Sequence, residues 1–61
     1  MYIELTLKHL DVKSLFLVNN IACMYPFENG TRIHLIGDDL PFDCIEKYDE
    51  IKRLILSEAQ R

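Results

Sequence analysis

Cysteine and histidine are the side chains in this 61-residue chain that could form a zinc site. Zinc sites commonly use pairs of these residues two to four positions apart in the sequence. The chain has two of each type, and none lies within four positions of another: they are His9, Cys23, His34 and Cys44. We therefore expect no metal ion and no cofactor, and we interpret both cysteines as buried free thiols.

Nucleophilic catalysis requires a nucleophile, a base and a group that orients the base. Ser14 or Cys44 could act as a nucleophile with a histidine as its base, but no motif places such groups together. A domain of this size also has little room for a concave substrate site. The sequence predicts no catalytic residue, no small-molecule substrate and no enzymatic activity.

Acidic residues gather at Asp38, Asp39 and Asp43, where a cation could be imagined. Their spacing lacks the alternating oxygen ligands of a calcium loop. We interpret Asp38 and Asp39 as part of a solvated turn, because aspartate and glycine favour turns.

The formal net charge of −3 argues against nucleic acid as a partner, because most nucleic-acid-binding domains carry a basic patch. Lys8, Arg32 and His34 could still contact phosphate, with Phe16 and Met24 beside them. An accessory or regulatory nucleic-acid-binding protein is therefore the alternative hypothesis for function.

With 49% hydrophobic and 28% charged residues, the chain is expected to form one globular domain, residues 1–61. Its apolar runs are too short to span a bilayer, and the N-terminus alternates instead of forming a signal peptide. We expect a cytoplasmic protein without membrane contact. Because so small a domain is only marginally stable, self-association is the expected additional support.

Alternating apolar and polar residues predict a half-buried strand at Tyr2–Leu7, followed by a connection at Lys8–Lys13. Four more strands are predicted, at Ser14–Val18, Ile21–Phe27, Thr31–Ile36 and Leu40–Cys44. Pro41 confines the last strand to a sheet edge, or to pairing after the proline. Short connections favour sequential antiparallel pairing.

The period changes to three and four residues after Ile45, which predicts an amphipathic C-terminal helix. Its core stripe would contain Tyr48, Ile51, Ile55 and Ala59, with Asp43 as a possible N-cap. The predicted fold class is α+β: a four- to five-stranded, strongly bent antiparallel sheet followed by one C-terminal helix.

Asn29-Gly30 is a strong hairpin signal that permits two registers. A two-residue Asn29-Gly30 loop would place Pro26 in a hydrogen-bonded pair with Ile33, although proline has no N–H. We therefore predict a three-residue loop with Gly30 in the left-handed region and Pro26 opposite Arg32, on a free edge or at a bulge. The predicted core face then carries Cys23, Tyr25, Ile33 and Leu35, and the opposite face carries Met24, Pro26, Arg32, His34 and Ile36.

One helix can cover only one face of such a sheet, so the second face would expose a contiguous apolar surface. A partly closed barrel is one explanation for it. We favour an interface with a second copy of the chain or with another protein. The expected interface residues are Phe16, Val18, Met24, Pro26, Ile36, Leu54 and Leu56.

The sequence resembles a family of very short bacterial and phage proteins that includes the flagellar-operon protein FlbD. The similarity rests on Ile3–Thr6, Phe16–Asn19, Ile21, the turn Glu28–Thr31 with Ile33 and Leu35, and Glu46, Tyr48, Glu50 and Ile51. It covers most of the chain and implies no catalytic residue.

Overall fold

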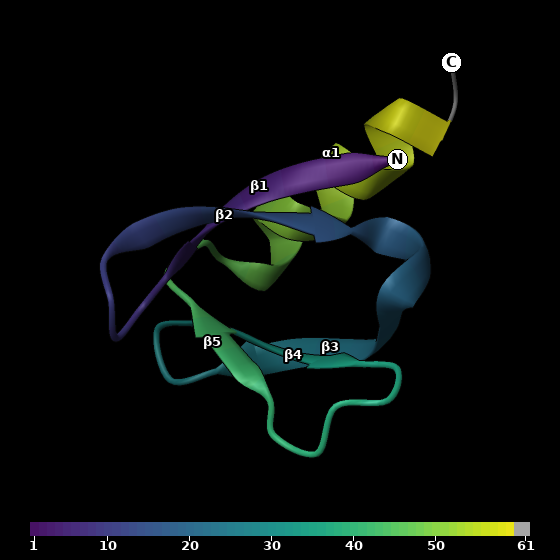
Figure 1. Cartoon of the computed structure of the whole chain (residues 1–61). Coiled ribbons are helices and arrows are strands. Elements are labelled where there is room, and N and C mark those ends of the chain that lie inside the picture. The colour runs from purple at the N-terminus through teal and green to yellow at the C-terminus, as the bar shows by residue number, and fades with distance from the viewer. Residues whose placement is uncertain (60–61) are drawn as a thin grey trace.

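A computed structural model describes residues 1–59, with side chains through residue 57 (Figure 1). The elements are β1 (Tyr2–Leu7), β2 (Val12–Leu17), a 3-10 helix η1 (Val18–Asn20), β3 (Ile21–Phe27), β4 (Gly30–Leu35), β5 (Phe42–Cys44) and α1 (Tyr48–Ala59). The predicted α+β class is thus confirmed: one five-stranded antiparallel sheet precedes a C-terminal helix. The described residues contain no helix with the length and apolar character needed to cross a membrane.

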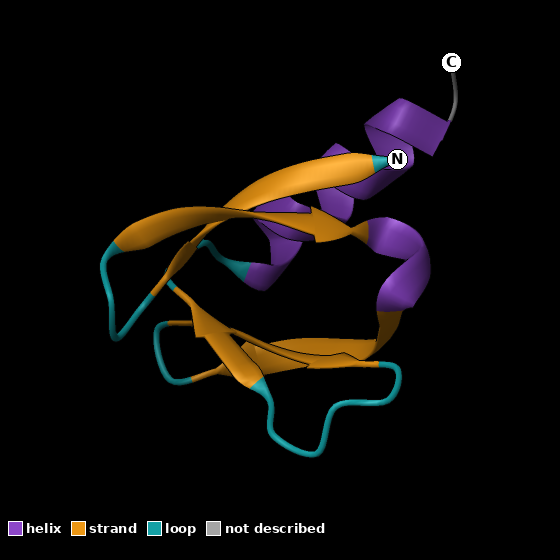
Figure 2. Cartoon of the chain, viewed as in Figure 1, coloured by secondary structure: helices purple, strands orange, loops and turns teal. Residues whose placement is uncertain are grey.

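The sheet has the strand order β2-β1-β5-β4-β3. Three of the four predicted sequential pairs form, namely β1–β2, β3–β4 and β4–β5, whereas the predicted β2–β3 pair is wrong and β1 pairs with β5 instead. The short strand β5 returns between β1 and β4, while η1 leads the chain from β2 to β3 without pairing them (Figure 2). Lys8 N–H donates to the Asp43 carbonyl at 2.8 Å, and Ile45 N–H donates to the Thr6 carbonyl at 3.1 Å. Pairing of β5 begins at Phe42, directly after Pro41. Of the two predicted outcomes for Pro41, an edge position or pairing only after the proline, the structure shows the second.

The hairpin between β3 and β4 has a register that differs from both predicted alternatives. Phe27 pairs with Gly30, so the loop consists of Glu28 and Asn29, and Glu28 adopts the positive φ of 54°. Pro26 lies opposite Thr31, which alternation makes a non-hydrogen-bonded pair. The constraint set by proline is therefore met in a register that moves Gly30 from the loop into the strand.

A glycine is required at position 30 because a larger residue would not fit, and not because the backbone there is left-handed. A Cβ atom on Gly30 would overlap the backbone carbonyl oxygen of Cys44 on the neighbouring strand β5. Glycine thus allows β5 to approach β4 at this point.

The changed register exchanges the faces of β3, because side chains alternate along a strand. Met24 pairs with Ile33 on the core side, whereas Cys23 pairs with His34 and Tyr25 with Arg32 on the outer face. The predicted core positions of Cys23 and Tyr25 are therefore wrong: both side chains are exposed.

The core lies inside the bend of the sheet, between the β1–β2 hairpin and strands β4 and β5. Its buried apolar residues are Ile3, Leu5, Phe16, Ile33, Cys44 and Ile51. Phe16 is only 5% exposed and meets Phe42 edge-on, with the ring centroids 5.8 Å apart. The bend turns Phe16 inward, so its predicted place on an exposed second face is wrong.

The helix packs against this core through Ile51, which is buried, and Ile55, which is half-buried. Ala59, the last residue of the predicted stripe, has a side chain outside the described residues. Asp43 is not the N-cap, because it lies in β5 and α1 begins at Tyr48. The segment before the helix is held by Glu46, whose carboxylate accepts from Thr6 and whose backbone carbonyl accepts from the Thr31 hydroxyl at 2.8 Å.

Candidate interaction surface

Strands β2 and β3 are the two edges of the sheet in the described part of the chain. An edge strand presents unpaired N–H and C=O groups to which another strand can bind. Strand β3 contains Pro26, which lacks an N–H, and this confirms the prediction that Pro26 lies on an edge strand. Strand β2 contains no proline or glycine and is the edge better suited to accept another chain.

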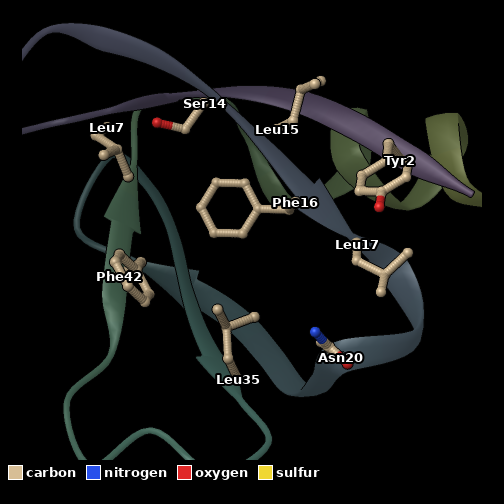
Figure 3. A pocket seen from close by; sticks show the side chains of 9 residues that line it. All are labelled: Tyr2, Leu7, Ser14, Leu15, Phe16, Leu17, Asn20, Leu35 and Phe42. Carbon is tan, nitrogen blue, oxygen red and sulfur yellow. The ribbon is translucent and has the colours of Figure 1, made fainter.

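A pocket of about 400 Å³ borders β2 (Figure 3). Its walls are mainly apolar, and the Phe16 ring lies between β2 on one side and Phe42 and Leu35 on the other. The lining residues are Tyr2, Leu7, Ser14, Leu15, Phe16, Leu17, Asn20, Leu35 and Phe42. The pocket therefore has an apolar lining and lies beside an unpaired strand edge.

Three large apolar side chains on the two strands of this hairpin are exposed to solvent, as is Leu10 in its loop. The exposed fractions are 64% for Tyr2, 50% for Val12 and 68% for Leu15. Leu15 points away from the pocket that Phe16 enters (Figure 3). Alternation places Tyr2 and Leu15 on the outer face of the hairpin and Val12 on the face of Phe16, near the turn. Exposed apolar side chains beside a free strand edge are typical of a surface that another protein covers.

The interface residues predicted from the sequence do not share one face. Phe16 is in the core, and Val18 and Met24 are half-buried against it. The others are exposed on three different elements: Pro26 on β3, Ile36 after β4, and Leu54 and Leu56 on α1. The register of β3 and the bend of the sheet separate them.

Sequence reasoning missed Tyr2, Val12 and Leu15 as interface candidates. Tyr2 shares the outer face of β1 with Glu4, where an aromatic residue among polar ones is a signal that could have been used. Leu15 belongs to an apolar run that was interpreted as covered on both faces. Only the strand order shows that β2 is an edge.

Arg32 already has two interaction partners on the outer face of β4, Asp43 and Phe27. Its guanidinium donates to both carboxylate oxygens of Asp43 at 2.7 and 3.0 Å and lies 3.6 Å from the centre of the Phe27 ring. The hydrogen bond from Arg32 lowers the pKa of Asp43, while partial burial opposes this shift. This pair joins β4 to β5 on the solvent side of the sheet.

The other two residues proposed to contact nucleic acid, Lys8 and His34, also have partners within the chain. Lys8 donates to the Glu28 carboxylate at 2.6 Å, which lowers the pKa of Glu28. The Tyr25 hydroxyl and His34 Nε2 form a hydrogen bond of 3.0 Å, and their rings are stacked. A phosphate would have to compete with these contacts, so the geometry does not favour the nucleic-acid alternative, which stays a prediction.

The two thiols differ in environment, and both are free. Cys44 is buried as predicted, and burial raises the pKa of its thiol to about 11. Cys23 is exposed and shares the outer face with His34, not the opposite face as predicted. Within residues 1–57, no three potential ligand side chains gather closely enough to hold a metal ion.

No family model, no curated protein and no solved structure matches the chain. The resemblance to the FlbD-like family therefore stays a prediction.

Proposed function

We propose that the chain is a small non-enzymatic protein-interaction module that acts as a homodimer, with the β1–β2 hairpin as the contact. The observation that carries this proposal is the exposure of Tyr2 and Leu15 on the outer face beside the free edge of β2, with Val12 exposed at the turn end of the same strand. Apolar side chains this exposed gain free energy when a partner removes them from water. A domain of 61 residues also gains stability from association, because it buries little surface on its own.

Sedimentation equilibrium tests this proposal directly. The wild type should have twice the 7.2-kDa mass of the chain at micromolar concentration. Leu15→Glu should yield a monomer, since it places a charge where the second copy would pack. A wild type that is monomeric up to millimolar concentration would contradict the proposal.

Leu40→Glu is the matched control for this experiment. Leu40 is 77% exposed in the turn before β5, outside the two strands of the β1–β2 hairpin. The substitution changes charge and hydrophobicity in the same way as Leu15→Glu. The Leu40 variant should remain dimeric, and loss of the dimer in both variants would argue against the hairpin as the contact.

A further inference from the structure

We propose that the second copy binds by antiparallel pairing of its β2 strand with β2, on a two-fold axis at Leu15. This inference rests on the proposed homodimer and assigns its contact to the strand backbone, with a defined register. The sheets of the two copies would then join into one continuous sheet across the axis.

The backbone groups that β2 directs outward follow from the hydrogen bonds of β1. Lys8 N–H and the Thr6 carbonyl both form hydrogen bonds to residues 43 and 45, so the backbone N–H and C=O groups of Lys8 and Thr6 point toward β5. Because these groups alternate in direction along a strand, the backbone N–H and C=O groups of Leu5 and Leu7 point toward β2, where Leu5 pairs with Ser14.

Ser14 and Phe16 consequently direct their backbone groups toward β1. The hydrogen bond from Val18 N–H to the Met1 carbonyl, at 2.9 Å, continues the same alternation. Lys13, Leu15 and Leu17 therefore direct N–H and C=O away from β1, where the described residues provide no partner strand.

These outward residues are self-complementary in an antiparallel arrangement. With the axis at Leu15, Leu15 pairs with Leu15 of the partner subunit, and Lys13 pairs with Leu17 of the partner subunit. Each outward N–H then meets a carbonyl. Each lysine faces a leucine and not the other lysine, so like charges are not placed opposite one another.

The other edge of the sheet explains why the assembly would close as a dimer. The same alternation, followed through β5 and β4, directs the backbone groups of Met24 and Pro26 outward from β3. Pro26 has no N–H to donate, so β3 is a poor partner for β2. Head-to-tail addition of β2 to β3, which would produce open filaments, is thereby disfavoured relative to the isologous pair.

The pocket beside β2 is the second observation in favour of a strand at this position. Ser14, Leu15, Phe16 and Leu17 all line it, although consecutive side chains alternate between faces. The pocket therefore borders the backbone edge itself. A strand added there would cover its mouth and remove Phe16, Leu35 and Phe42 further from water.

The decisive experiment removes one N–H from the edge. The chain is short enough for chemical synthesis, so N-methyl-Leu15 can replace Leu15 and leave the side chain and the intramolecular hydrogen bonds unchanged. The control carries N-methyl-Met24, which alters an outward N–H on the other edge. We expect dimerisation to weaken at least about 30-fold for the Leu15 analogue, because the methyl group removes two symmetry-related hydrogen bonds and separates the strands. The Met24 analogue should associate like the unmodified chain.

Amide hydrogen exchange on the unmodified chain supplies a second measurement that needs no variant to fold. Exchange of the Lys13, Leu15 and Leu17 amides should slow as concentration rises from micromolar to millimolar. Exchange of Ser14 and Phe16, whose amides bond to β1 in either state, should change much less.

The results separate this inference from the homodimer on which it rests. A dimer that forms equally well with N-methyl-Leu15, or that leaves the three outward amides exchanging at the monomer rate, would overturn the strand pairing and retain the homodimer. An unmodified chain that stays monomeric would overturn both.

Discussion

Glu46 and Thr6 are forty positions apart in the chain, and the Glu46 carboxylate binds Thr6 at both its backbone and its side chain. The Thr6 N–H donates to the two carboxylate oxygens at 2.9 and 3.0 Å, and the Thr6 hydroxyl donates at 2.9 Å. Strand β5 ends just before this point, at Cys44, so a carboxylate takes the place of the next backbone carbonyl beside β1. The Glu46 carboxylate thus provides the hydrogen-bond acceptor for the Thr6 N–H of β1 where the neighbouring strand β5 ends.

Glu46→Ala should lower the free energy of unfolding by about 2–4 kcal/mol, because it leaves the Thr6 N–H and hydroxyl without a partner in a buried position. Urea unfolding followed by circular dichroism measures this loss. Glu4→Ala is the control, because Glu4 is exposed on β1, the strand that contains Thr6. Its effect on the free energy of unfolding should stay within about 0.5 kcal/mol. Equal effects of the two substitutions would show that the Glu46 contact contributes little.

Gly30→Ala should destabilise the fold by at least about 2 kcal/mol, since the new Cβ would overlap the Cys44 carbonyl and separate β4 from β5. Gly37 provides the contrast: it has a φ of 87°, and a Cβ there meets no atom within 4 Å. Gly37→Asn should therefore cost less than about 1 kcal/mol, because asparagine tolerates a left-handed backbone. Thermal or urea unfolding of both variants tests the difference, and a Gly30 variant as stable as the wild type would refute the steric argument.

The sequence was sufficient to predict the strands, the helix and the fold class, because each depends on local periodicity. Tyr2–Leu7 was predicted with its observed bounds, since alternation along one strand identifies its buried side directly. The burial of Ile51 followed from helical spacing in the same way.

The strand order and the β3–β4 register depend on interactions between distant segments. Gly30 resembles a loop residue in the sequence, yet it lies in β4, where the carbonyl of Cys44, fourteen positions later, leaves no space for a side chain. The observed register differs by one position from the predicted one, which exchanges the faces of Cys23 and Met24. The candidate interface could not be predicted for the same reason, because an edge strand is defined only by the order of the whole sheet.

Asp43→Asn should remove a pH-dependent part of the stability. The pKa of Asp43 is lowered in the folded state by the hydrogen bond from Arg32, so the carboxylate stabilises the fold at neutral pH. A lowered pKa contributes stability that is fully present above the ordinary aspartate pKa of 3.8 and is lost as the pH falls through the lower folded-state value. Urea unfolding at pH 7 and at several values below 4 should show the wild type and Asp43→Asn converging in acid. A difference that is the same at every pH would contradict an ionised Asp43 as its source.

The exposed and buried thiols should react at very different rates in the native protein. Cys23 is open to solvent, whereas Cys44 is buried and has a pKa of about 11, so only about one thousandth of its thiol would be ionised at pH 8 even if a reagent reached it. A disulfide reagent at pH 8 should modify one thiol per chain rapidly and the second only on unfolding in urea. Cys23→Ser should abolish the rapid phase and leave the slow one, which assigns each phase to its residue. Rapid modification of Cys44 in the folded Cys23→Ser variant would mean that β5 opens readily from between β1 and β4, in conflict with its central place in the sheet.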